Sequence, residues 1–239
     1  MIAFAAAPAT LPDGERVYAV GDVHGCLDRL RAMHRIIAAD IANRPAASVT
    51  LVHIGDYVDR GPDSAGVLDL LATAPPPPGV TTVVNLLGNH EAMMLDAITL
   101  RTPSAARHWL ANGGEATLHS FGLGDADDPA AWAARLPAER IAFLRALPLT
   151  HRAGGYVFVH AGLRPGVALA AQAREDMLWI REPFLSADTP FEAVVVHGHT
   201  PVPAPVLRPN RVGIDTGAVM GGALTGVVLE ADRIGFISA

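Results

Sequence analysis

Apolar stretches and polar loops alternate through the first hundred residues of the chain. Short apolar stretches bounded by glycine and turn-forming residues are typical of buried strands. Three such stretches are predicted as strands, and each ends in a polar loop. They are residues 17–20 before Gly21-Asp22, residues 49–54 before Gly55-Asp56, and residues 80–87 before Gly88-Asn89-His90.

Helical spacing follows these strands. Residues 27–39 and 64–72 carry apolar side chains three or four positions apart, and a third helix is expected to begin near Glu91. Three strand–loop–helix units in succession predict parallel strands whose carboxyl ends lie at one edge of a sheet. Ligands of open α/β sheets bind just outside that edge, so the three polar loops form a candidate site.

The second half of the chain changes character. Residues 104–147 are predicted to be mainly helical, with a loop over residues 122–129. Beyond Pro148, short β-branched stretches are separated by glycine and proline, which favours a sheet with tight connections. The predicted fold class is therefore α/β, a central β-sandwich of mixed sheets flanked by α-helices. The later strands are expected at residues 156–159, 194–196, 212–214, 223–229 and 234–237.

Length and composition favour one globular domain over residues 1–239. Half of the residues are hydrophobic and 18% are charged, which is typical of a chain that buries a core. Residues 1–14 are apolar and lack the basic start of a secretory signal, so we expect a flexible N-terminal arm on a cytoplasmic protein. The single cysteine, Cys26, excludes an intrachain disulfide and an all-thiolate metal site.

The charge pattern narrows the classes of partner. The formal net charge is −6, and no run of Lys or Arg is long enough to follow a nucleic-acid backbone. No stretch has the 18 or more apolar residues of a membrane span. We therefore expect neither a nucleic-acid nor a membrane partner, and the oligomeric state stays open.

The polar loops carry the residue types that phosphate-ester hydrolysis requires. That reaction needs charge neutralisation, an activated water and a proton for the leaving oxygen. Carboxylate, amide and imidazole ligands suit Mn²⁺, Fe or Zn²⁺. A single Gly-Asp after a strand is common as a turn or cap, but several such loops with His or Arg indicate a site. The candidates are Asp22, His24, Asp56, Asp59, Arg60, Asn89, His90, His160 and His199.

One carboxylate shared by two metal ions would hold them roughly 3.5–4 Å apart, the spacing used for in-line displacement at phosphorus. Asp56 is central among the loops and is our candidate for that bridge. Tyr57 is expected to line the cleft, and His197 to support the metal site from behind.

Four motifs together resemble the phosphoprotein phosphatase family of the metallophosphoesterases, in particular its phage and bacterial members. They are Gly-Asp-Tyr-Val-Asp-Arg-Gly at 55–61, Gly-Asn-His-Glu at 88–91, Trp-Leu-Ala-Asn-Gly-Gly at 109–114 and Ile-Asp-Thr-Gly-Ala at 214–218. The matching pattern extends over residues 21–225. The resemblance implies a metallophosphoesterase-type sandwich and a cofactor of two metal ions, Mn²⁺ ahead of Fe or Zn²⁺.

The resemblance also implies a role for each candidate. One metal would be held by Asp22, His24 and Asp56, and the other by Asp56, Asn89, His160 and His199. His90 is similar to the family's general acid, and Asp59 to the carboxylate that orients it. Arg60 and Arg181 are similar to its two phosphate clamps.

The expected function is that of a dinuclear-metal serine/threonine protein phosphatase, which hydrolyses phosphoproteins or phosphopeptides with a metal-activated water. The main alternative is a symmetrical bis(5′-nucleosyl)-tetraphosphatase. Asp59 before the arginine of the second loop and Glu91 after the histidine of the third resemble the phosphatase pattern and so favour the phosphatase. Pro201 stands where nucleases and phosphodiesterases of the wider group carry a second His. A binding module that has lost catalysis would lack some of these polar residues, yet all are present.

Overall fold

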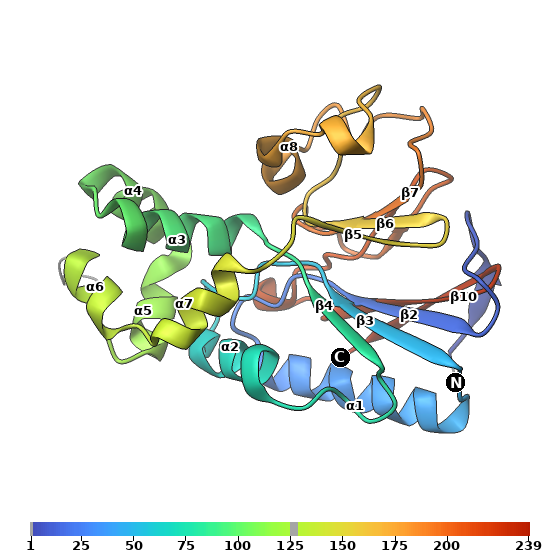
Figure 1. The fold of residues 1–239 in the computed structure, drawn as a ribbon, viewed down its shortest axis with the longest axis horizontal. Helices are drawn as coiled ribbons and strands as arrows, with labels where there is room; N and C mark the ends of the chain where they lie inside the picture. Colours follow the sequence, from blue (N-terminus) through green and yellow to red (C-terminus); the bar gives the residue numbers. More distant parts are fainter. Residues whose placement is uncertain (1, 125–128) are drawn as a thin grey trace.

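Two mixed sheets face each other in the computed structural model, which describes residues 2–124 and 129–239 (Figure 1). The first sheet has the strand order β1-β11-β10-β2-β3-β4, in which β2, β3 and β4 are parallel and β10 and β11 antiparallel. Its strands are β1 (Phe4–Ala6), β2 (Glu15–Val20), β3 (Ser48–His53), β4 (Thr82–Asn85), β10 (Thr225–Glu230) and β11 (Arg233–Ser238).

The second sheet has the order β5-β6-β7-β9-β8, with β6, β7 and β9 parallel. Its strands are β5 (Thr150–Ala153), β6 (Tyr156–Val159), β7 (Val194–His197), β8 (Val206–Leu207) and β9 (Arg211–Gly213). The predicted sandwich of mixed sheets is confirmed, and each predicted strand coincides with an observed one to within a few residues.

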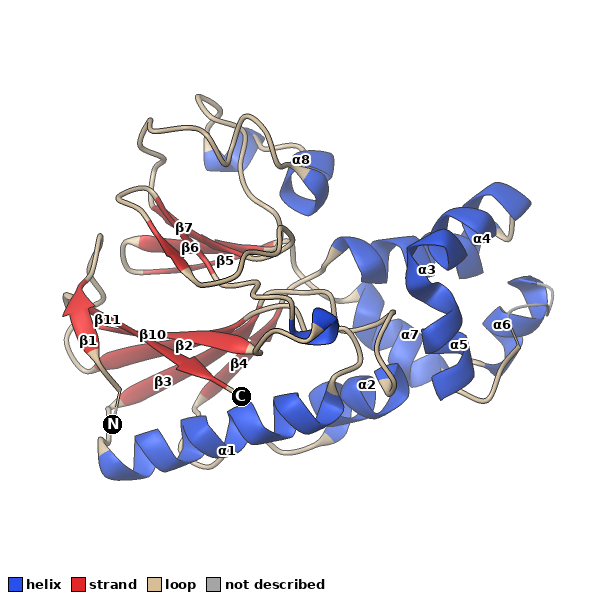
Figure 2. Ribbon diagram, turned by 180° about the vertical axis from the view of Figure 1, so that it is seen from behind, coloured by secondary structure: helices blue, strands red, loops and turns tan. Residues whose placement is uncertain are grey.

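Helices cover the outer faces of the sandwich and extend it to one side. Helices α1 and α2 lie beneath the first sheet, α8 lies above the second, and α3 to α7 gather beyond one end of the sheets (Figures 1 and 2). Their bounds are α1 (Leu27–Asn43), α2 (Ser64–Thr73), α3 (Asn89–Leu100), α4 (Pro103–Trp109), α5 (Glu115–Ser120), α6 (Pro129–Arg135), α7 (Ala138–Arg145) and α8 (Arg174–Trp179). The expected loop over 122–129 falls largely outside the described residues.

The apolar alternation of β2 explains how the layers pack. Val17 and Ala19 point between the two sheets, whereas Tyr18 and Val20 point into the core beneath the first sheet, with helix α1. Successive side chains of a strand point to opposite faces, so a continuous apolar strand supplies both cores at once. The strand is thereby fixed in register, and so is the loop at its carboxyl end.

The N-terminal segment differs from the flexible arm that was expected. Phe4–Ala6 form strand β1 and pair antiparallel with β11, and Leu11 is buried. The Phe4 ring also lies against the guanidinium groups of Arg44 and Arg233. The strand with which β1 pairs lies more than 220 residues away in the sequence, so no local sequence pattern predicts β1.

No helix among residues 2–124 and 129–239 is long and apolar enough to cross a membrane.

Candidate metal centre and active site

The candidate residues come together at the edge where the carboxyl ends of the parallel strands meet. Loops after β2, β3 and β4 bring residues from the first sheet, and loops after β6 and β7 bring residues from the second. The buried members are Asp22, His24, Asp56, Asp59, Asn89, His90, His160 and His199.

A first cluster contains His24, Asp56 and His90, whose nearest nitrogen and oxygen atoms all lie within 4.8 Å of one another. The Nδ1 of His24 lies 2.8 Å from the carbonyl oxygen of Val58 and must donate to it. Its Nε2 therefore carries the lone pair and faces the Asp56 carboxylate at 3.5 Å. A backbone carbonyl that fixes the tautomer in this way is typical of histidines that bind metals.

A second cluster contains Asp56, His160 and His199 within the same 4.8 Å limit. Asn89 joins it, because its Oδ1 lies 2.8 Å from His160 Nε2 and 3.0 Å from His199 Nδ1. His160 Nδ1 faces the carbonyl oxygen of Ile54 at 3.0 Å. Asp56 belongs to both clusters, which is the position that a bridging ligand requires.

Three buried polar atoms at this edge have no hydrogen-bond partner among the described residues. They are Asp22 Oδ1, His199 Nε2 and, in the same loop as His199, Thr200 Oγ1. The other carboxylate oxygen of Asp22 accepts the backbone N–H of His199 at 3.0 Å, which ties the loop after β2 to the loop after β7. Because buried polar groups are rarely left unpaired, these atoms indicate that a ligand binds between the sheets.

The charge distribution at the site suits cations. Burial raises the pKa of Asp22 well above its usual value, and the nearby carboxylates of Asp215 and Asp56 raise it further. Burial likewise raises the pKa of Asp215 to about 6. Carboxylates crowded into a buried pocket repel one another, and divalent ions relieve that repulsion. The donor set therefore fits a pair of metal ions.

The surrounding histidines favour the ionised form of Asp56. Burial alone would raise its pKa, but His160, His90 and His24 lower it well below the usual range. Burial also lowers the pKa of His24 to about 4 and that of His199 to about 3. These two imidazoles are therefore neutral near pH 7, the state that binds a metal.

His90 differs from the other site histidines in its charge preference. Burial lowers its pKa, but Asp56 and Asp59 raise it by more, so the net shift is upward. Its Nδ1 lies 2.7 Å from Asp59 Oδ2, and Asp59 is completely buried. The pair has the geometry of a proton donor oriented by a carboxylate.

Two exposed arginines lie beside the clusters. Arg60 Nη1 donates to His24 Nε2 at 2.8 Å. Arg181 acts on His199 electrostatically: burial has the largest lowering effect on the His199 pKa, followed by His160, and the Arg181 charge lowers it further. Guanidinium groups at this position can bind phosphate oxygens in pairs.

The backbone is left-handed at several of these residues. Positive φ angles are uncommon outside glycine because the Cβ atom meets the backbone. Of the seven non-glycine residues with positive φ in the described part of the chain, five belong to the site, so the strain found there is concentrated at the site. The five are His24, Asp56, Asp59, Arg60 and His199.

Glu91 organises the site, although the sequence assigned it no role there. Its fully buried carboxylate accepts the backbone N–H groups of Asp56 (2.8 Å), Tyr57 (2.7 Å), Val58 (3.1 Å) and Gly88 (3.0 Å). Burial and Asp56 raise its pKa to about 8, against the lowering effect of His90 and these donors. The available signal was a Glu three residues after Gly88, where a helix-capping carboxylate is expected.

Tyr57 and His197 were also expected to contribute to the site. Tyr57 does not line the cleft: its side chain is fully buried, and its hydroxyl donates to the carbonyl oxygens of His53 and Leu86. His197 is also buried, and its Nδ1 lies 3.1 Å from the carbonyl oxygen of Gly198. It therefore contacts the backbone next to His199.

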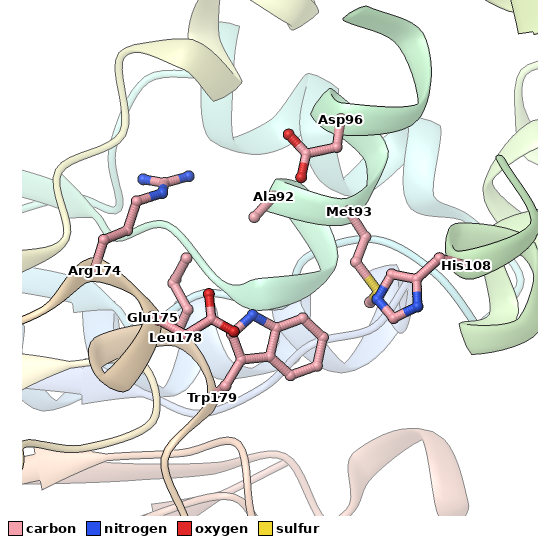
Figure 3. A pocket seen from close by; sticks show the side chains of 8 residues that line it. All are labelled: Ala92, Met93, Asp96, His108, Arg174, Glu175, Leu178 and Trp179. Atoms are coloured by element: carbon pink, nitrogen blue, oxygen red, sulfur yellow. The ribbon is translucent and has the colours of Figure 1, made fainter. Parts of the chain in front are cut away.

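A groove lies between α3, α4 and α8 (Figure 3). Its volume is about 370 Å³. Ala92, Met93, Leu178 and Trp179 give it apolar walls, and Asp96, His108, Arg174 and Glu175 add polar groups. The Trp179 ring lies 6.1 Å from the His199 ring, so the groove begins beside the candidate metal ligands.

Comparison with known proteins places these observations in a family. The profile described as calcineurin-like phosphoesterase matches residues 15–222. Serine/threonine-protein phosphatase 1 of Salmonella typhimurium (strain LT2) is 33% identical over 225 residues, which cover 87% of this chain and 89% of that protein.

Two further similar proteins are named for a different activity. The symmetrical bis(5′-nucleosyl)-tetraphosphatase of Aromatoleum aromaticum is 29% identical over 75% of this chain, but the match covers only 51% of that protein. A crystal structure described under the name of a diadenosine tetraphosphatase superposes with a TM-score of 0.67 at 25% identity, covering 97% of this chain and 98% of that one.

Proposed function

The chain belongs to the calcineurin-like phosphoesterases, and we propose that within this family it is a serine/threonine protein phosphatase that depends on two metal ions. The observation that carries the proposal is the site itself. Two donor clusters share Asp56, and an imidazole–carboxylate pair and two arginines lie beside them. Each element that phosphomonoester hydrolysis requires is thus present at one edge of the sandwich.

The metal ligands in this proposal are those predicted from the sequence. The unpartnered atoms Asp22 Oδ1 and His199 Nε2, together with the inward-facing Nε2 atoms of His24 and His160, fit hard or borderline cations such as Mn²⁺. When bound, two such ions supply charge neutralisation for the phosphate and activation of the attacking water. The ligand set is Asp22, His24, Asp56, Asn89, His160 and His199.

The protein's own side chains supply the remaining steps. Arg60 and Arg181 bind the phosphate oxygens of the substrate and orient the ester bond for in-line attack. His90 donates a proton from Nε2 to the leaving alkoxide, and Asp59 holds the Nδ1 proton of the same ring. A serine alkoxide leaves poorly without a proton, so this donor matters most for alkyl esters.

Two residues favour the phosphatase over the tetraphosphatase. Asp59 precedes the arginine of the second loop, and Glu91 follows the histidine of the third, as in the phosphatase pattern. In the structure both are buried and hydrogen-bonded at the site. The groove beside Trp179 offers a place for the peptide chain next to the phosphorylated residue, because its apolar walls and charged groups suit mixed side chains.

The test is a substrate panel with the Mn²⁺-loaded protein. We expect hydrolysis of a phosphoserine peptide and of p-nitrophenyl phosphate, with Asp56→Asn inactive on both. Trp179→Ala should raise KM for the peptide several-fold and leave KM for p-nitrophenyl phosphate unchanged, because the small substrate does not reach the groove. Absence of peptide hydrolysis, with cleavage restricted to diadenosine tetraphosphate, refutes the phosphatase.

The second candidate is the dinucleoside tetraphosphatase. The full-length structural similarity at 25% identity favours it. In that case the panel should show diadenosine tetraphosphate as the preferred substrate by kcat/KM, and Trp179→Ala should weaken binding of the dinucleotide through lost stacking on the indole.

A further inference from the structure

Asp59 receives hydrogen bonds from a part of the chain that the proposed mechanism does not use. The indole Nε1–H of Trp109 lies 3.0 and 3.1 Å from its two carboxylate oxygens, and the Thr117 hydroxyl lies 2.7 Å from Oδ1. With His90 Nδ1 at 2.7 Å from Oδ2, this buried carboxylate has three side-chain partners among the residues that the structure describes. Two of the three come from the helical region around α4 and α5.

The same region also holds the backbone beside Asp59. The Asp59 N–H donates to Thr117 Oγ1 at 2.8 Å and to Ser64 Oγ at 3.0 Å, and the Arg60 N–H donates to the carbonyl oxygen of Gly113 at 3.1 Å. Asp59 and Arg60 are consecutive left-handed residues, with φ of 74° and 67°. Such a conformation persists only where surrounding contacts determine it.

A wide helical turn makes both contacts possible. Leu110–Gly114 joins α4 to α5 and contains Gly113 at a φ of 100°, which breaks the regular helix. A Cβ atom on Gly113 would lie 2.8 Å from Arg60 Cγ, so glycine is required for the close approach. Wide turns of this kind are frequently found at functional sites. Here the turn lets Trp109 before it and Thr117 after it reach the same carboxylate.

Burial alone does not explain the tryptophan. Trp109 is fully buried and packs against Trp132 with ring centroids 5.7 Å apart, and any large apolar ring would satisfy that role. A phenylalanine, however, offers no N–H to Asp59. The carboxylate would then lose a donor that fixes its plane, and it could turn away from His90 Nδ1.

We propose that Trp109 and Thr117 are positioning residues that orient the Asp59 carboxylate toward His90, and thereby aim His90 Nε2 at the leaving oxygen. The inference rests on the proposed function, in which His90 is the proton donor. It assigns a task to the Trp-Leu-Ala-Asn-Gly-Gly motif at 109–114. The helical region is then part of the proton-transfer machinery as well as of the core.

The experiment compares Trp109→Phe with Trp132→Phe as a matched control. Both changes remove a buried indole N–H, but that of Trp132 lies 3.2 Å from the carbonyl oxygen of Gly124, away from Asp59. For Trp109→Phe we expect kcat on a phosphoserine peptide to fall roughly 10- to 100-fold, part of the full general-acid effect. KM should not change, and p-nitrophenyl phosphate should be hydrolysed within about threefold of wild type. The control should match wild type on both substrates.

A second pair of variants guards against a folding defect. Thr117→Val keeps the shape and removes the hydroxyl, so it should show the same selective loss of kcat. Thr117→Ser keeps the hydroxyl and should restore activity toward the peptide. Parallel loss on both substrates, or a Trp109→Phe enzyme as active on the peptide as Trp132→Phe, overturns the assignment.

His90→Asn separates failure of this inference from failure of the proposed function. In the His90→Asn background, Trp109→Phe should cause no further loss, because a residue that acts through His90 has nothing left to orient. A further loss of more than about threefold in the double variant contradicts the positioning role. If His90→Asn itself lowers kcat equally on both substrates, His90 is not the proton donor, and the proposed mechanism fails with it.

Discussion

At the scale of single residues, the acceptor that faces Nδ1 of each site histidine determines which of its nitrogens is left for the site. His24 and His160 each donate Nδ1–H to a main-chain carbonyl, so their Nε2 atoms carry the lone pairs and point into the site, where they face Arg60 Nη1 and Asn89 Oδ1 respectively. His90 donates its Nδ1–H to Asp59 instead, which is the arrangement that the proposed proton-transfer role requires. The same side chain thus serves different chemistry according to the acceptor behind it.

The role of Arg181 can be tested by its effect on binding. Arg181→Ala should raise KM for phosphopeptides about tenfold or more and change kcat less, because a charged hydrogen bond to phosphate is worth about 1.5–3 kcal/mol. Arg181→Lys should recover only part of the loss, since an ammonium cannot bind two oxygens in parallel. Steady-state kinetics measure both. An unchanged KM in Arg181→Ala would show that another group binds the phosphate.

His34 and His53 should make stability depend on pH independently of the site. Their Nε2 atoms lie 2.9 Å apart, and burial lowers the pKa of His34 to about 4 and that of His53 to about 3. The unfolded chain binds protons near pH 6.5, so stability is complete above that pH and falls as the pH drops toward 4. Each histidine that stays neutral in the folded protein at pH 5 lowers the unfolding free energy at that pH by about 2 kcal/mol.

The matched variant is His34→Gln. Between pH 8 and pH 5, in the presence of a chelator, it should lose about 1–2 kcal/mol less unfolding free energy than wild type. Urea titrations at the two pH values measure the difference. Identical losses in the two proteins would mean that the histidine pair binds no additional protons when the chain unfolds.

At the scale of elements, the sequence reveals most where the signal is local. Each of the three early strands carries its own apolar pattern and ends in its own polar loop, and so the candidate residues at that edge could be found. Strand β1 could not, because its three pairs with β11 depend on contacts across the whole chain. Tyr57 was misplaced for a related reason, since its hydroxyl also reaches the carbonyl oxygen of Leu86, 29 residues further along the chain.

The N-terminal strand should therefore contribute to stability. Deleting residues 2–8 removes the β1–β11 pairing and the contact of Phe4 with Arg44 and Arg233. We expect Tm to fall by about 2–8 °C, corresponding to about 1–2 kcal/mol in a domain of this size. Calorimetry measures the change, and kcat and KM serve as the control and should not change. A truncated protein with the wild-type Tm would favour the flexible arm.

At the scale of the whole molecule, the site joins two sheets that otherwise meet through an apolar core. Asp22 and Asp56 follow strands of the first sheet, while His160 and His199 follow strands of the second. A ligand that binds all four stabilises the folded chain by mass action, about 2.7 kcal/mol at a hundred times its dissociation constant.

Metal binding should accordingly be visible in the melting temperature. Adding Mn²⁺ to chelator-treated protein should raise Tm by about 5–10 °C, and Asp56→Asn should show a much smaller rise because both clusters lose their shared carboxylate. Differential scanning fluorimetry over a Mn²⁺ titration measures the shift. Equal shifts in the two proteins would place the ion elsewhere.

The left-handed residues of the site limit how thermally stable an active form of this protein can become. At each of them glycine would relieve roughly 1–2 kcal/mol of steric strain, and yet glycine would remove the side chains of the proposed metal ligands His24, Asp56 and His199. A laboratory screen that rewards only heat tolerance would favour replacement at these positions and recover folded, inert variants. Selection for activity has to retain the strained backbone conformation. Thermal stability and catalytic activity therefore place opposite demands on the same few positions in the chain.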